Sequence, residues 1–178
     1  LEPELEDLWK KFEEKSCHTF FQNLFFIKKI TTLKKSNFYF VVIYDSDEII
    51  AIFPFEIKKI FAVKILQWIG TKYSDYCCPL ISKEHKINSE FFKDLWARIL
   101  KKIDCDIIIL NNQPKYIDNL ENPFVNFLTN SEISKVFLID LPDDKNEYYK
   151  NIENKKFLNE FKRTTNQIIE KHDLKFEN

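Results

Sequence analysis

The sequence predicts an α/β (α+β) domain: a mixed sheet with a leading antiparallel meander, flanked by helices. Three strand patterns follow one another over residues 38–70, with connections too short for a crossover, so neighbouring strands must run antiparallel. A periodic helix pattern comes next at 88–103, and a wholly apolar run follows it at 105–112. This order of elements is typical of a layered domain built on one sheet.

Two helices are expected before the meander. Residues 3–15 carry apolar side chains at helical spacing, and Pro3 with acidic side chains in the first turn favours a helix start. Thr19 is expected to cap a second, shorter helix that ends near Ile27.

The meander is predicted from β-branched and aromatic residues at 38–45, 48–59 and 61–70. Pro54 lies inside the second strand and has no N–H to donate, which predicts an edge position or a bulge. Gly70 is the only glycine in the chain and ends the third strand.

The second half alternates helices and strands. Asn88 or Ser89 is expected to cap the helix at 88–103. The run at 105–112 is apolar at every position up to its final asparagines, apart from Asp106, which predicts a central strand covered on both faces. Further elements are predicted with less regular patterns: a helical turn at 124–129, a strand at 135–141, a helix start at 147–152 and a basic helix at 155–172, with a domain boundary within 142–154.

Composition excludes several classes of protein. The 27 basic and 28 acidic side chains nearly cancel, and only two of the basic ones are arginines, which argues against nucleic acid as a partner. No apolar run approaches the roughly 18 residues of a membrane span, and no signal peptide is recognisable, so we expect a cytoplasmic protein. The chain has no methionine, and we expect it to be a segment of a longer protein.

The cysteines and histidines indicate structure rather than chemistry. Four cysteines occur without a metal-binding spacing and are expected to be reduced and mostly buried: Cys17, Cys77, Cys78 and Cys105. His18, His85 and His172 are far apart, and none has a nearby acid at ligand spacing. We therefore expect no metal site and no Ser-His-Asp or Cys-His arrangement.

The stretch GTKYSDYCCPL, residues 70–80, is the best candidate site. Asp75 is the candidate catalytic residue, as a base that orients or deprotonates an acceptor amine or hydroxyl. Tyr73 and Tyr76 would form stacking walls for a sugar, with Ser74 between them. The alternative is that Asp75 only bonds its own loop backbone in an Asx-turn.

A resemblance rests on this loop and on NEYYKNIENKKFLNEFKRTTNQIIEKHDLKF, residues 146–176. Together they resemble the two-lobed, GNAT-like acetyltransferases of bacterial cellulose and exopolysaccharide synthesis, which are distantly similar to the Fem-type aminoacyltransferases of peptidoglycan. The resemblance implies that residues 1–150 form an N-terminal GNAT-like lobe. Residues 151–178 would begin a second, truncated GNAT-like lobe, and this missing C-terminal lobe would hold the acyl-donor site.

The same resemblance implies a function. The full-length protein would move an acyl group from acetyl-CoA or another acyl-CoA to an amine or hydroxyl of a small-molecule or saccharide acceptor, such as a polysaccharide or cell-envelope precursor. The loop 73–76 would shape the acceptor side, and Lys156 and Arg163 of the basic helix would meet the donor. The alternative is a degenerate, non-catalytic module that binds a saccharide or a protein partner.

One departure from the family pattern bears on the cofactor. A GNAT enzyme holds the pyrophosphate of coenzyme A in a Gly-rich turn at a helix N-terminus, because only glycine lets backbone N–H groups approach the anion closely. With Gly70 as its only glycine, this chain has no such turn. We therefore expect no cofactor in this segment and no activity from it alone. A basic run such as that on helix 155–172 is also common on a merely solvated face.

Overall fold

The computed structural model describes residues 1–85, 87–128, 143–144, 147, 150 and 155–172. The chain divides into two compact units, Leu1–Glu132 and Ile133–Asn178. The first contains every strand that the structure describes, and the second contains one long helix.

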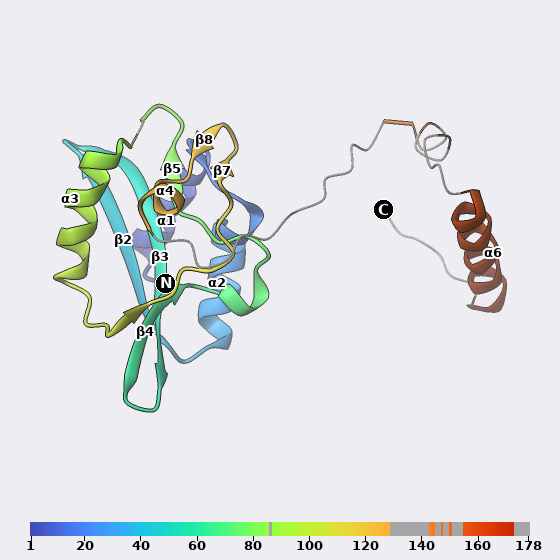
Figure 1. Ribbon diagram of the computed structural model, residues 1–178, viewed down its shortest axis with the longest axis horizontal. Helices are drawn as coiled ribbons and strands as arrows, with labels where there is room; N and C mark the ends of the chain where they lie inside the picture. The colour runs from blue at the N-terminus through green and yellow to red at the C-terminus, as the bar shows by residue number, and fades with distance from the viewer. Residues whose placement is uncertain (86, 129–142, 145–146, 148–149, 151–154, 173–178) are drawn as a thin grey trace. The chain divides into compact units, whose positions relative to one another are not determined.

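The first unit is built on a mostly antiparallel, six-stranded sheet (Figure 1). Its strands are β1 (Ser16–Cys17), β2 (Asn37–Asp45), β3 (Glu48–Ile60), β4 (Val63–Trp68), β5 (Leu80–Ser82) and β6 (Ile107–Ile108). β3 is central: β2 pairs along one side, and β4 and β5 pair in turn along the other. β1 extends the sheet beyond β5, and β6 runs parallel to β4. The predicted class and the predicted antiparallel meander are confirmed.

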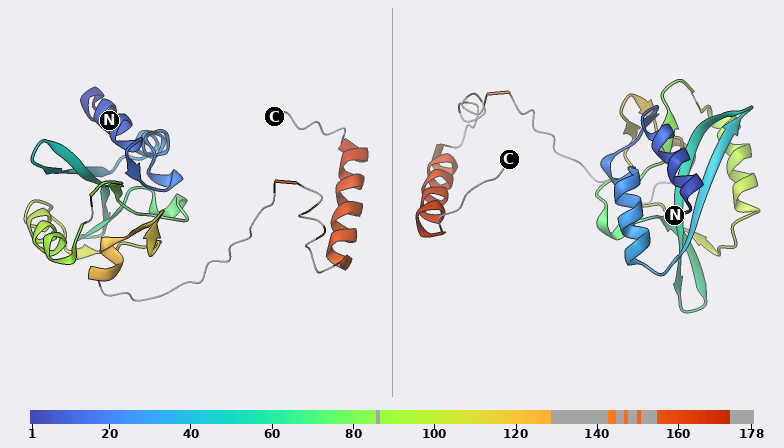
Figure 2. Two further views of the ribbon diagram at one scale, coloured as in Figure 1. Left: turned by 90° about the horizontal axis from the view of Figure 1, so that it is seen from above. Right: turned by 180° about the vertical axis from the view of Figure 1, so that it is seen from behind.

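Helices cover both faces of this sheet (Figure 2). The helical and minor elements of the first unit are α1 (Pro3–Glu13), η1 (Phe20–Gln22), α2 (Leu24–Leu33), η2 (Thr71–Tyr73), α3 (Ser89–Leu100), α4 (Pro123–Phe127) and the small hairpin of β7 (Tyr116–Ile117) and β8 (Leu120–Glu121). On one face, Trp9 of α1 and Ile27 of α2 pack against Ile52. On the other, Phe92 of α3 and Phe124 of α4 pack with Phe53, and the Phe53–Phe124 ring centroids are 5.1 Å apart.

The helix predicted to follow Thr19 starts later than expected. The Thr19 hydroxyl donates to Gln22 Oε1 at 2.6 Å, which closes the short turn η1 instead of capping α2. Asn23 caps α2, because its side-chain oxygen accepts from the Phe26 N–H at 2.8 Å. The helix then runs to Leu33, past the predicted end at Ile27.

The predicted edge position or bulge at Pro54 is wrong. Pro54 lies in the central strand and pairs with Phe40 of β2, and the register shift of the β2–β3 pair lies instead between Ile43 and Tyr44. In a strand, the N and C=O of one residue point to the same neighbour. The Pro54 carbonyl accepts from Ile69 N at 3.0 Å, so its ring nitrogen faces the point where β4 has ended and β5 has not begun. The missing N–H therefore leaves the pairing with β2 intact and removes only the return bond to Ile69, just past the end of β4.

The predicted central strand at 105–112 is also wrong. Only Ile107–Ile108 are in a strand, β6, which pairs with β4 and stands at the end of the strand order among the residues that the structure describes. Ile107 and Ile109 are exposed, while Ile108 is half-buried. A run of isoleucines has the same composition at an edge as in a centre, so the sequence pattern did not distinguish the two positions.

The second unit contains α6 (Lys155–His172), with the bounds that the sequence predicted. Lys156 and Arg163 are both exposed on it, and the rings of Phe157 and Phe161 stack with centroids 6.4 Å apart. The strand predicted at 135–141 lies outside the described residues, as do most of the predicted helix start at 147–152 and most of the boundary at 142–154.

No helix in the described ranges is both long and apolar enough to cross a bilayer.

Candidate functional site

The loop 70–76 lies at the carboxyl ends of the one parallel strand pair in the sheet. β4 ends at Trp68, and the chain leaves the sheet after Ile69 before it returns as β5. The strand parallel to it, β6, ends at Ile108, and the following residues run on to Asn112 beside the loop. In sheets with parallel strands, the carboxyl ends are where ligands usually bind.

Gly70 starts the loop in a conformation that suits glycine. Its φ of 77° is left-handed, and a Cβ added there would lie 3.3 Å from both a Phe26 ring carbon and the Ser74 hydroxyl oxygen. The Gly70 carbonyl accepts from Tyr73 N at 2.7 Å and from Ser74 Oγ at 3.0 Å. The tight turn is therefore closed by its own backbone and by Ser74.

Asn112 holds the loop from the side of β6. Its side-chain nitrogen donates to the Ser74 carbonyl at 2.9 Å and to the Thr71 carbonyl at 3.5 Å, and its own carbonyl accepts from Cys77 N at 2.8 Å. Asn112 has a left-handed φ of 58°, which asparagine tolerates better than most residues. Sequence reasoning missed this residue; an Asn-Asn pair directly after an apolar run was the available signal.

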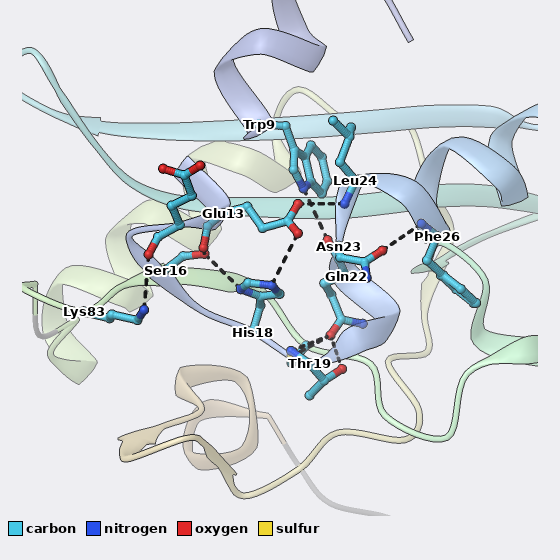
Figure 3. Close-up of polar contacts among 12 residues, drawn as sticks. Trp9, Glu13, Ser16, His18, Thr19, Gln22, Asn23, Leu24, Phe26 and Lys83 are labelled. Atoms are coloured by element: carbon cyan, nitrogen blue, oxygen red, sulfur yellow. Dashed lines mark hydrogen bonds and ion pairs between the residues drawn. The ribbon is translucent and has the colours of Figure 1, made fainter. Parts of the chain in front are cut away.

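Gln22 holds the opposite end of the loop. Its side-chain nitrogen donates to the Tyr76 carbonyl at 3.1 Å, and its side-chain oxygen accepts from Cys78 Sγ at 3.0 Å. The oxygen also accepts from Thr19, as Figure 3 shows. Gln22 is buried, so these bonds tie the loop to the entry of α2.

The four residues predicted to bind the acceptor differ in exposure and do not form one shared surface: Tyr73, Ser74, Asp75 and Tyr76. Ser74 is buried and its hydroxyl donates within the loop, whereas Asp75 is exposed. Tyr76 is half-buried, and Tyr73 is 55% exposed. The exposed chemistry of the loop is therefore the carboxylate of Asp75 and the ring of Tyr73.

The Asp75 carboxylate has no hydrogen-bond or ion-pair partner among the residues that the structure describes. The Asx-turn alternative needs this carboxylate to accept from a nearby backbone N–H, and no such bond occurs among the described residues; the side chain that bonds the loop backbone is Ser74, which donates to the Gly70 carbonyl. Asp75 is thus available to a ligand, although no side chain encloses it.

A half-buried ion pair, between Lys34 and the buried Glu56, lies next to Tyr73. The Lys34 ammonium is 5.5 Å from the centroid of the Tyr73 ring and donates to Glu56 at 3.0 and 3.3 Å. Glu56 is 1% exposed and also accepts from Gln67 at 2.7 Å. Lys72 lies 5.9 Å from the same ring. Cations at this distance over a ring face attract it, and neither Lys34 nor Glu56 was singled out from the sequence.

The cysteines beside the loop are not nucleophiles at neutral pH. Burial raises the pKa of Cys77 to about 11, although hydrogen bonds to Ser74 and Thr71 lower it in part. Burial also raises the pKa of Cys78 to about 12. A thiol of this kind stays protonated and inert. All four cysteines are free, and three are buried.

A second group of polar side chains lies where α1 meets α2 (Figure 3). His18 lies between Ser16, with Nδ1 to Oγ at 3.1 Å, and Glu13, with Nε2 to Oε1 at 3.9 Å. The serine is buried, and the other oxygen of Glu13 accepts from Leu24 N at 2.8 Å, at the start of α2. The group joins two helices and offers no exposed nucleophile.

Among the described residues, no three His, Cys, Asp or Glu side chains gather where they could share a metal ion. In comparisons with family models, curated proteins and solved structures, nothing matched this chain. The role of loop 70–76 must therefore be inferred from its own geometry and chemistry.

Proposed function

We propose that the first unit is the acceptor-binding, GNAT-like lobe of an acyltransferase. The proposed reaction moves an acetyl or other acyl group from an acyl-CoA to an amine or hydroxyl of a polysaccharide or cell-envelope precursor. The observation that supports it is a firmly held loop at the carboxyl ends of β4 and β6 that exposes an aromatic ring, Tyr73, and a carboxylate, Asp75, with no partner among the described residues.

In this proposal Asp75 takes the proton from the acceptor nitrogen or oxygen as that atom attacks the thioester carbonyl. The carbon–sulfur bond breaks, and coenzyme A leaves as a thiolate that takes up a proton. No covalent enzyme intermediate forms. General base catalysis of this kind typically contributes about 10²–10⁴-fold to a rate. Tyr73 would stack on a sugar ring and position the acceptor.

The donor would bind outside the first unit. Its described part has one glycine, Gly70, whose turn is filled by Ser74 and leads into a 3₁₀ turn of three residues. We propose that a second lobe, begun by residues 151–178, supplies the cradle for the acyl-CoA. Lys156 and Arg163, both exposed on α6, would meet its phosphates.

A non-catalytic saccharide-binding module is the second candidate. The same exposed ring and carboxylate also suit this alternative, because no described side chain bonds Asp75 and orients it as a base. In such a module the ring would provide the affinity, and Asp75 would accept hydrogen bonds from sugar hydroxyls.

Replacing Asp75 separates the two candidates. With the full-length protein, acetyl-CoA and a partly deacetylated chito-oligosaccharide, Asp75→Asn should lower kcat by about 10²-fold or more, because the amide cannot take the proton. Asp47→Asn, in the exposed turn between β2 and β3, is the matched control and should change nothing.

Tyr73→Ala should weaken saccharide binding in either case. Release of free coenzyme A thiol measures transfer, and titration calorimetry measures binding. Saccharide binding without any thiol release by the unmodified protein would contradict acyl transfer and favour the binding module. Equal thiol release by the unmodified protein and by Asp75→Asn would remove Asp75 from the mechanism.

A further inference from the structure

The β3–β4 hairpin projects from the first unit (Figures 1 and 2), and its tip is apolar. Phe61 at the turn is 96% exposed, and the paired residues Ile60 and Val63 are 40% and 38% exposed. These side chains are next to one another, so they form a continuous apolar tip rather than scattered surface residues. Contiguous exposed apolar groups mark interaction sites more often than single ones do.

The conformation of Phe61 makes this exposure costly. Its φ of 53° is left-handed, which is rare for a bulky side chain and is usual for Gly or Asn in a hairpin turn. Packing of the Phe61 ring does not offset this backbone strain, because almost all of the ring surface is exposed to solvent. Stability of the hairpin does not explain why a phenylalanine is at this position.

Lysines surround the stem directly behind the tip. Lys59 and Lys64 are cross-strand neighbours on one face, and Lys58 lies on the other face, the one that carries Ile60 and Val63. A hollow of about 480 Å³ beside the stem is lined by Lys35, Lys58, Lys59 and Lys64. The stem therefore carries positive charge on both of its faces.

Two acidic side chains offset part of this charge. Lys64 pairs with Asp104, and the Lys64 backbone N–H donates to Asp106 at 2.7 Å. Lys35, Lys58 and Lys59 have no ion-pair partner in the described part of the chain. Like charges placed across a strand pair repel one another, so a bound anion would reduce the repulsion between the lysines of the stem.

We propose that this hairpin docks the protein on a bilayer that contains anionic lipids. The apolar tip enters the interfacial region, and the lysines behind it contact the headgroups while their stems reach along the ribbon. A protein partner fits less well, because lysine is depleted in protein–protein interfaces, whereas an anionic membrane surface attracts it. The proposal does not depend on acyl transfer.

Vesicle sedimentation tests this proposal. The protein should sediment with vesicles of phosphatidylcholine mixed with phosphatidylserine, and much less with phosphatidylcholine alone. Phe61→Asn, which suits a left-handed φ, should fold and lose binding by about tenfold or more. Lys58→Gln combined with Lys59→Gln should lose about fivefold for each lysine.

Two matched controls lie away from the hairpin. Phe25→Gln removes another exposed phenylalanine, on α2, and Lys10→Gln with Lys11→Gln removes two adjacent lysines of α1. Both should bind vesicles as the unmodified protein does. Equal loss in the controls, or no preference for anionic vesicles, would overturn the assignment of the hairpin.

Insertion of the tip can be observed directly. The native tryptophans Trp9, Trp68 and Trp96 are all buried, so the emission of Phe61→Trp can be followed against a background that lipid does not reach. It should shift to the blue on anionic vesicles and be quenched by brominated acyl chains. An unchanged emission, or a dimer that Phe61→Asn abolishes in the absence of lipid binding, would contradict the proposal.

Discussion

Single residues set the geometry of loop 70–76, and they are not the residues that the loop exposes. Gly70 and Asn112 adopt left-handed conformations, and buried Ser74 bonds the Gly70 carbonyl. These three leave the side chains of Asp75 and Tyr73 available, because their bonds to the loop go to its backbone. A substitution at Gly70, Ser74 or Asn112 can therefore destabilise the loop without changing its exposed side chains. A substitution at Asp75 or Tyr73 can change those side chains without destabilising the loop.

Asn112 has two separable roles. Asn112→Gly keeps the left-handed backbone and loses the amide bonds to the Ser74 and Thr71 carbonyls, which should cost about 1 kcal/mol of the free energy of unfolding. Asn112→Ala loses the same bonds and also strains the backbone, which should cost about 1–2 kcal/mol more. Urea unfolding of both variants gives the comparison. Equal stabilities would show that the left-handed backbone is not what selects asparagine.

The sequence indicated the exposed residues of the site better than the buried ones. Tyr73 and Asp75 attract notice because a polar, aromatic loop follows an apolar strand. Asn112, Lys34 and Glu56 approach this loop from distant parts of the chain through tertiary contacts. No local spacing encodes those contacts, so they could not be predicted without the fold.

Among the elements, those with a complete local signal were predicted well. Both α3 and α6 carry a full apolar periodicity, and the strands of the meander are rich in β-branched and aromatic residues and are joined by tight turns. Pro54 and the run at 105–112 were misplaced because their surroundings depend on where β4 ends and on which strand pairs with β6. Neither fact can be predicted from the local sequence.

The start of α2 provides a test at the scale of an element. Asn23→Ala removes the bond to Phe26 N and should lower the free energy of unfolding by about 1 kcal/mol, whereas Asn23→Asp should retain it. Thermal unfolding followed by circular dichroism measures both variants. An equal loss in both would mean that the Asn23 side chain does not cap the helix.

At the scale of the whole molecule, the first unit combines two exposed features that lie on different elements. The loop 70–76 is at the carboxyl ends of β4 and β6, and the apolar tip at Phe61 is at the turn between β3 and β4. Along β4, the tip precedes the strand and the loop follows it, so the two occupy opposite ends of one strand. A bilayer held at the tip would leave the loop open to an acceptor.

Nuclear magnetic resonance mapping of acceptor binding tests the central claim most directly. Backbone amide shifts are recorded while a β-linked chito-oligosaccharide is added to the protein. We predict saturable shifts in residues 70–76 and at Asn112, with few changes in the β3–β4 hairpin. Shifts confined to other surfaces, or none at the highest saccharide concentration, would contradict the assignment of this loop as the acceptor site.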